Sequence, residues 1–216
     1  MADGIPVKSW SRLARWAGLG AFASYLSSAF VPLPEPVALF LAFAFGPLFM
    51  VASLGLYRLL KMWKPSLWLE VAFLFNVVAT ALVTLMLAVQ QTSFAFHDKF
   101  KTADRGSVTD EQLRWIFKEV NAVQLGIDIA WDVFISLGTA CFAIGMWKHP
   151  VFGRILPAVG VTVSVLLLGF NLVWFPEPPA DAGSIDFGPA VALWYMGMAV
   201  YLKVKGSSLE ASVSGT

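Results

Sequence analysis

Six apolar stretches, each about 20 residues long, dominate the sequence and restrict what the chain can fold into. A helix needs about 20 apolar residues to cross about 30 Å of hydrocarbon, and in lipid every backbone polar group must be paired inside the protein. A helix meets this requirement within a single segment. The sequence therefore predicts an all-α membrane protein, a bundle of six transmembrane helices at residues 12–31, 37–60, 67–92, 121–147, 152–175 and 187–204.

Composition and proline positions agree with this prediction. Hydrophobic residues make up 58% of the chain and charged residues only 13%, whereas soluble domains carry about 25% charge. Prolines lie between the stretches, where they end one helix and begin the next. We expect one domain over residues 1–205 and a disordered Ser/Gly-rich tail over 206–216. Residues 8–31 also resemble a signal peptide, but we expect them to form the first span.

The lysines and arginines indicate an orientation. With the N-terminus inside, ten basic residues fall on the cytoplasmic side, and the other five lie outside, within residues 99–118. Cytoplasmic loops carry an excess of Lys and Arg, so we expect both termini to be cytoplasmic. The outer side then receives nine acidic residues, which would attract cations to the outer surface of the protein. Alternatively, these acids only make the outer loops polar. They are Glu35, Asp98, Asp104, Asp110, Glu111, Glu119, Glu177, Asp181 and Asp186.

Two aspartates, Asp128 and Asp132, lie one helical turn apart inside the fourth expected span. No Lys, Arg or His lies within residues 125–147 to neutralise them. An aspartate at the centre of a membrane helix costs about 2.5 to 3.5 kcal/mol, and ionisable residues there usually mark a functional site. Two such carboxyls can share one proton or accept a cation in its place. The structural alternative is that they only form hydrogen bonds between helices.

The aspartates belong to a polar stripe with spacings of three and four residues, which puts its members near one helix face. The stripe comprises Asn121, Gln124, Asp128, Asp132, Ser136 and Thr139. A second stripe in the third expected span comprises Asn76, Thr80, Thr84 and Gln91. We expect the stripes to face each other inside the bundle, with Asn171 and Tyr195 also near the carboxyls.

An aromatic ring could assist a bound cation, and Trp131 is adjacent in sequence to Asp132. Tyr25, Trp194 and Tyr195 could do the same, although aromatic residues at span ends are more often interfacial anchors. The expected ligand- or ion-binding residues are therefore Asp128, Asp132, Asn76, Thr80, Gln124, Asn171 and Trp131.

Four local features have simpler explanations. Asp186 precedes Gly188-Pro189 and is expected to cap the sixth helix. Glu70 is expected to pair with Lys61 or Lys64. The polar connection 97–113 contains a helix start at residues 109–111, either of a surface helix or of an outward extension of span four.

The fourth feature is a small-residue face in the first span, formed by Gly20, Ser24 and Ser28. Such a face permits close helix contact, either with another span or with a second subunit in a homo-oligomer.

The sequence lacks the residues that several common protein chemistries require. The histidines, His97 and His149, fall in opposite loops and cannot ligate one haem together. Cys141 lies inside a span, where we expect a small buried side chain. No nucleotide-binding loop or nucleophile elbow is present. We expect no cofactor, and a net charge of +1 gives no reason to expect nucleic acid.

The second half resembles a known group of proteins over about residues 120–200. The segments that carry the resemblance are 128–134 (DIAWDVF), 148–154 (KHPVFGR), 171–179 (NLVWFPEPP) and 186–189 (DFGP). They look like a group of bacterial six-span membrane proteins catalogued as a domain of unknown function. The resemblance implies a bacterial inner membrane and six spans, and it supplies no substrate or catalytic residue.

These observations favour an integral membrane protein that binds a proton or small cation at an outward-facing carboxylate pair, with or without translocating it. The alternative is a non-catalytic interaction or sensory protein in which Asp128 and Asp132 are structural. A membrane enzyme is third, since paired carboxyls can serve acid–base catalysis.

Overall fold

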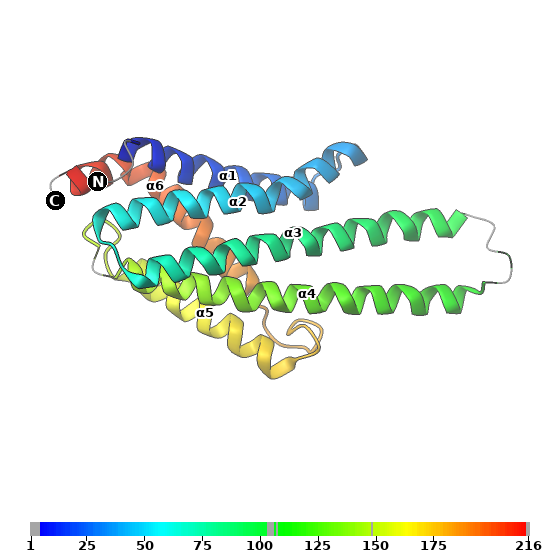
Figure 1. The fold of residues 1–216 in the computed structure, drawn as a ribbon. Helices are drawn as coiled ribbons and strands as arrows, with labels where there is room; N and C mark the ends of the chain where they lie inside the picture. The colour runs from blue at the N-terminus through cyan, green and yellow to red at the C-terminus, as the bar shows by residue number, and fades with distance from the viewer. Residues whose placement is uncertain (1–4, 103–105, 107, 148, 215–216) are drawn as a thin grey trace.

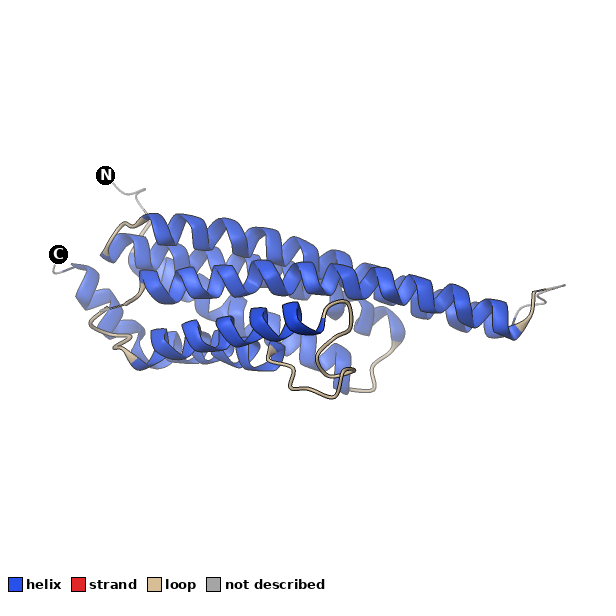
Figure 2. Cartoon of the chain, turned by 90° about the horizontal axis from the view of Figure 1, so that it is seen from below, coloured by secondary structure: helices blue, strands red, loops and turns tan. Residues whose placement is uncertain are grey.

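The computed structural model describes residues 5–102, 106, 108–147 and 149–214. Its six helices are α1 (Val7–Phe30), α2 (Glu35–Trp63), α3 (Leu67–Thr102), α4 (Asp110–Gly145), α5 (Ile155–Trp174) and α6 (Gly188–Ser214) (Figure 1). Figure 2 shows that helices account for the regular structure of the described residues. Lys148 and Arg105, which contributed to the expected orientation, and Asp104, one of the expected outer acids, lie outside these residues.

Among the described residues, four of the six helices, α2 to α5, are long and apolar enough to cross a membrane. The all-α class and the membrane character expected from the sequence are thereby confirmed. The described part of α1 begins with Lys8, Arg12 and Arg15, and α6 carries Lys203 and Lys205 in its second half. These charges lower the mean hydropathy of α1 and α6.

The helical hairpin of α3 and α4 is longer than the expected spans. Each helix has 36 residues, which at about 1.5 Å per residue gives about 54 Å. The polar connection expected over residues 97–113 is mostly helical, because α3 continues to Thr102 and α4 begins at Asp110. A capping box starts α4: Thr109 Oγ1 accepts from Gln112 N at 3.2 Å, and Thr109 N donates to Gln112 Oε1 at 3.0 Å. The residues before span four therefore extend that helix and do not form a separate surface helix.

The end of α6 also differs from the expected disordered tail, because the helix continues through residue 206 to Ser214. Extending an existing helix is easier than starting a new one, so a short polar segment can remain helical. Residues 215 and 216 lie outside the described part.

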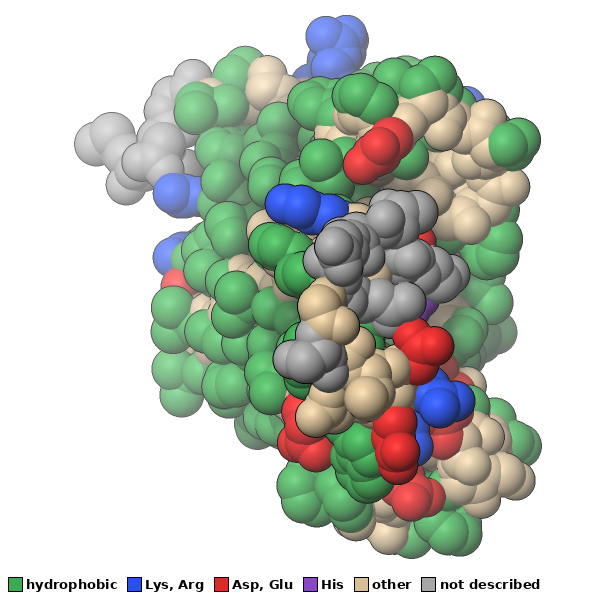
Figure 3. Space-filling model, turned by 90° about the vertical axis from the view of Figure 1, so that its right-hand side faces the viewer, with side chains coloured by type: hydrophobic (Ala, Val, Ile, Leu, Met, Phe, Trp, Pro, Cys, Tyr) green, Lys and Arg blue, Asp and Glu red, His purple; other side chains and the backbone are tan. Residues whose placement is uncertain are grey.

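Successive helices run in opposite directions, so the connections gather at two ends of the bundle. The two termini, the α2–α3 turn and the α4–α5 turn lie at one end (Figure 1). The α1–α2 and α5–α6 connections lie toward the other end, beyond which the α3–α4 hairpin projects. Acidic side chains are prominent on this hairpin end (Figure 3).

Small residues allow α1 and α2 to pack closely. A Cβ built on Gly55 would lie 2.6 Å from the backbone nitrogen of Ala14, so a larger side chain there would force the helices apart. Ser24 is buried, and its hydroxyl donates to the Ala21 carbonyl at 2.8 Å. Gly20 lies against Leu48 of α2. Gly20 of the predicted small-residue face therefore contributes to the contact between α1 and α2, and a role of the face in a homo-oligomer stays a prediction.

Candidate functional site

Asp132 lies where α4 packs against α5. Only 6% of the residue is exposed, and the side chain of Asn171 in α5 lies close enough to interact with its carboxyl. One oxygen of this carboxyl is unpaired: Oδ1 is buried and has no hydrogen-bond partner among the described residues. A buried carboxylate oxygen without a partner is costly, so this atom needs an explanation.

Ser136 adds a second such atom one turn further along α4. The residue is 1% exposed, and its Oγ has no partner within the described part of the chain. Other buried hydroxyls donate to a carbonyl of their own helix: Thr139 to Ile135 and Ser164 to Gly160, both at 2.7 Å. Ser136 does not make this usual bond. Two oxygen atoms, Asp132 Oδ1 and Ser136 Oγ, thus remain unpaired on neighbouring turns of one helix.

Two further carboxylates lie toward the hairpin end. Asp128 is half-buried one turn before Asp132, and both interact electrostatically with Asp186 in the α5–α6 connection. Asp186 is exposed, and its Oδ1 accepts from Gly188 N at 2.7 Å, which confirms the predicted contact at the start of α6. Tyr25 of α1 lies close enough to interact with Asp128 and Asp186. Asp128, Asp186 and Tyr25 together form an acidic region beside Asp132, which we name the acidic entrance.

The acidic entrance does not form a cluster suited to a transition metal or zinc. Among the described residues, no three His, Cys, Asp or Glu side chains are placed to hold one metal ion. Any cation at Asp132 would therefore depend on the carboxylate together with neutral oxygen atoms.

Asn76 belongs to a separate polar cluster in the middle of the bundle. Its Nδ2 donates to Ser53 Oγ at 3.0 Å and to the Tyr195 hydroxyl at 2.9 Å, and that hydroxyl lies 3.1 Å from Asn76 Oδ1. Thr139 Oγ1 lies 3.0 Å from the same hydroxyl. The four residues are buried and come from α2, α3, α4 and α6. We name them the Asn76 cluster: Ser53, Asn76, Thr139 and Tyr195.

The structure therefore brings together only part of the predicted site. Asp128, Asp132 and Asn171 lie in one region. Thr80 instead donates to the Asn76 carbonyl of its own helix at 2.9 Å. Gln124 donates to Met86 Sδ of α3 at 3.8 Å.

Trp131 is half-buried, and its Nε1 has no hydrogen-bond partner among the described residues. Its ring packs against the hydrophobic core. The described contacts therefore assign Trp131 to packing, and a cation contact by its ring stays a prediction.

Three residues with a part in these polar contacts were missed from the sequence. Ser136 was recognised in the polar stripe but not proposed as a ligand, although its four-residue spacing from Asp132 was a usable signal. Ser53 and Tyr57 in α2 were not singled out. Tyr57 donates to the Glu70 carboxylate, beside the predicted ion pair of Lys61 Nζ and Glu70 Oε1 at 2.7 Å.

The half of the bundle nearer the termini is closed by apolar side chains. Leu59, Leu60, Leu69, Phe142 and Met146 are all 0% exposed. They lie between the Asn76 cluster and the turns at the terminal end. The buried polar groups near Asp132 therefore do not continue through this half of the molecule in the described residues.

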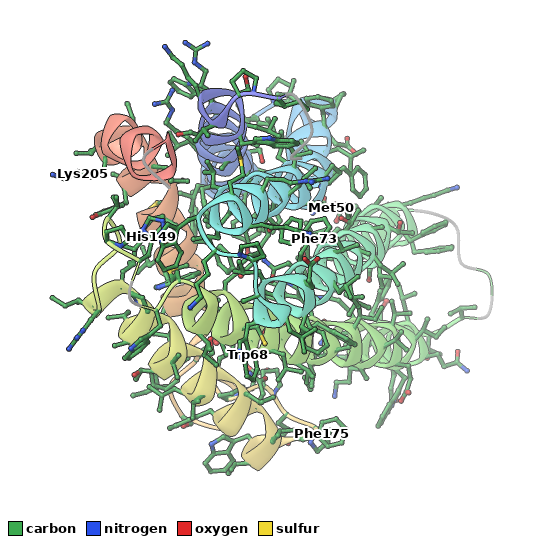
Figure 4. All side chains as sticks on the ribbon, turned by 60° about the vertical axis from the view of Figure 1, so that its left-hand side comes forward. Met50, Trp68, Phe73, His149, Phe175 and Lys205 are labelled. Atoms are coloured by element: carbon green, nitrogen blue, oxygen red, sulfur yellow. The ribbon has the colours of Figure 1, made fainter. Side chains whose placement is uncertain are left out.

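His149 lies beyond this apolar layer, in the turn after α4 (Figure 4). Its Nδ1 accepts from Val151 N at 3.1 Å, and its ring packs between those of Trp63 and Phe152, at centroid distances of 4.4 and 4.8 Å. Burial lowers the pKa of His149 to about 4. The imidazole is therefore neutral near pH 7 and acts as a packed aromatic residue.

Comparisons of the chain with protein-family models, with curated proteins and with solved structures gave no match. The case for a function therefore depends on the geometry around Asp132.

Proposed function

We propose that this protein binds a proton or small cation at an intramembrane site centred on Asp132 and entered past Asp128 and Asp186. The observation that carries the proposal is the buried Asp132 Oδ1, which has no hydrogen-bond partner among the described residues. An ionised carboxylate in that position requires a positive charge close by, and a neutral one requires a bound proton. Either state makes occupancy by a cation or proton part of the folded protein.

The proposed setting is a bacterial inner membrane, with six spans and both termini in the cytoplasm. The support is the sequence: an excess of Lys and Arg on the side of the termini and the resemblance over residues 120–200. The acidic entrance would then face outward. Acidic groups there would raise the local concentration of cations.

Binding of a proton or cation is better supported than its free passage through the bundle. The fully buried leucines, Phe142 and Met146 close the terminal half of the bundle. Translocation would need a second conformation in which this apolar layer opens. We therefore propose binding as the basic activity and translocation as an extension of it.

The structural alternative, in which Asp128 and Asp132 only hold helices in register, is less well supported. The Asn76 cluster already joins four helices through polar contacts of 2.9 to 3.1 Å. Asp132, by contrast, leaves one of its oxygen atoms unpaired in the described structure. A residue used only as a hydrogen-bonding connector would gain from having both oxygens paired.

The test is the thermal stability of the purified protein in detergent, measured from pH 5 to 9 with different added salts. We expect wild-type stability to depend on pH or on a cation, and Asp132→Asn to fold but lose that dependence. The amide keeps the shape of the side chain and removes its charge. Asp181→Asn is the matched control, because Asp181 is an exposed acid of the α5–α6 connection.

The outcomes separate the hypotheses clearly. A response that is lost in Asp132→Asn and kept in Asp181→Asn supports the site. Identical pH and cation profiles for wild type and Asp132→Asn would leave only the structural role.

A further inference from the structure

We infer that the ligand at Asp132 is a monovalent alkali cation, of the Na⁺ type, bound between the Asp132 carboxylate and the Ser136 hydroxyl. This inference rests on the proposed function and specifies its ligand. It begins from two unpaired oxygen atoms, Asp132 Oδ1 and Ser136 Oγ, which the described residues leave without partners.

Both atoms are well buried. Asp132 is 6% exposed and Ser136 is 1% exposed. Residues four apart on a helix have neighbouring side chains, with Cβ atoms about 5 to 6 Å apart. The two oxygens therefore belong to one small region of the bundle interior. Alkali and alkaline-earth cations prefer such carboxylate and neutral oxygen ligands.

The chemistry of the unpaired atoms favours a metal cation over a proton alone. A protonated carboxyl needs one acceptor for its hydrogen, and the hydroxyl of Ser136 would then normally donate to the carbonyl four residues earlier. Ser136 does not make that bond, whereas Thr139 and Ser164 do. A buried hydroxyl that makes no bond to its own helix, one turn from an unpaired carboxylate oxygen, leaves two oxygen ligands for one cation.

The charge in the region favours a single positive charge. Asp132 is the one acidic residue among the buried residues of the described structure, and Asp128 is half-exposed. A monovalent cation balances the one buried carboxylate, whereas a divalent ion would depend on the half-exposed Asp128 for its second negative charge. No three acidic, His or Cys side chains converge within the described residues, so a divalent site built from several charged ligands, as in many Ca²⁺ sites, is not found there.

The neighbours of Asp132 position it and provide the entrance. Asn171 of α5 is hydrogen-bonded within its own helix, Nδ2 to the Leu167 carbonyl at 3.0 Å, and its side chain also interacts with Asp132. The titratable groups that interact with Asp132 are Asp128 of α4 and Asp186 of the α5–α6 connection. Both are acidic, so they attract a cation to the entrance. Neither carries a positive charge that could take the place of the cation beside Asp132.

The experiment measures the thermal stability of the full chain in detergent at pH 8, at constant ionic strength. Choline chloride is replaced stepwise by NaCl or by KCl. We expect the melting temperature of wild type to rise by several degrees and to saturate with at least one of the two alkali cations, because a ligand that binds only the folded state stabilises it. Binding of radioactive sodium to the same preparation gives a second readout.

Ser136→Ala distinguishes a ligand from a passive hydroxyl. In choline chloride this variant should be at least as stable as wild type, because it removes an unpaired buried hydroxyl. In the alkali salt it should be less stable than wild type, because the cation has lost a ligand. Ser24→Ala is the matched control, since Ser24 is also buried but donates to the Ala21 carbonyl at 2.8 Å.

Asp132→Asn keeps the test decisive if Ser136→Ala does not fold. An alkali-cation response that is lost in Asp132→Asn and in any folded Ser136→Ala, and kept in Ser24→Ala, supports the inference. A response that survives either site substitution overturns it. A wild-type response to pH alone, lost in Asp132→Asn, also overturns it but leaves the proposed function intact. A wild type that responds to neither pH nor cations contradicts both.

Discussion

Tyr195→Phe tests whether the Asn76 cluster holds α2, α3, α4 and α6 together. The substitution removes one hydroxyl and keeps the aromatic ring, which packs edge-on against Phe49 with centroids 4.7 Å apart. Packing should therefore be preserved. Any change in the free energy of unfolding reports on the hydrogen bonds alone.

The expected cost follows from which atoms lose their partners. Asn76 Nδ2 keeps Ser53 Oγ at 3.0 Å, and Thr139 Oγ1 keeps the Ile135 carbonyl at 2.7 Å. Asn76 Oδ1 loses the Tyr195 hydroxyl at 3.1 Å and has no other hydrogen bond given by the described structure. One unpaired buried acceptor costs about 1 to 3 kcal/mol, whereas hydrogen bonds between membrane helices average about 0.6 and reach about 1.7 kcal/mol. We expect Tyr195→Phe to lose about 1 to 2 kcal/mol.

The assay is unfolding by sodium dodecyl sulfate in mixed micelles, followed by far-ultraviolet circular dichroism. Thr139→Val is the matched control, because it removes a hydroxyl that also bonds to its own helix and should cost less than Tyr195→Phe. Wild-type stability in Tyr195→Phe, or a larger loss in Thr139→Val, would refute the assignment of Tyr195 as the shared partner of this cluster.

Three other predictions follow from single features. Gly138→Ala should destabilise by about 2 kcal/mol in the same unfolding assay, because its Cβ would lie 2.1 Å from Asn76 Oδ1 and force a shift; an unchanged stability would contradict this close contact. The pKa of His149 falls from 6.5 to about 4 on folding, so its contribution is complete above pH 6.5 and is lost as the pH falls toward 4. That loss amounts to about 3 kcal/mol, and His149→Phe should flatten the stability profile in this window; a profile as steep as that of wild type would exclude His149 as its source. Accessibility tags near Lys64 should report the cytoplasm and those near Asp181 the opposite side; the same side for both would refute the proposed topology.

The membrane class was predictable because apolar length is a local property of the chain. The hairpin length was not, because the hydrophobic pattern indicates where a helix can contact lipid and not where it ends. α3 runs to Thr102, well past the expected limit of residue 92, and a capping box at Thr109 starts α4 ahead of its expected span. Continuing a formed helix into a polar segment costs little, so the helices extend until a cap or a break intervenes.

The polar stripe of α4 was recognised and Asn171 was expected near its carboxyls, but the different neighbours of the two ends of the stripe were not predicted. Each step of four residues advances about 40° beyond a full turn, so Gln124 and Ser136 differ by about 120° around the helix. Gln124 accordingly contacts Met86 of α3, whereas Asp132 interacts with Asn171 of α5. A stripe spread over that angle meets more than one neighbour. Which helix lies at each angle depends on packing between distant segments, and one chain's periodicity does not encode that.

The two polar regions of the bundle differ in how completely their atoms are paired, and this difference separates structure from function. In the Asn76 cluster, the amide and hydroxyl groups contact one another across four helices, as expected of groups that hold a fold together. At Asp132 and Ser136, two buried oxygens stay unpaired in the described structure, which lowers stability unless something occupies the region. Departures from full pairing are tolerated mainly where a protein does its work. The less satisfied region is therefore the better place to look for the ligand.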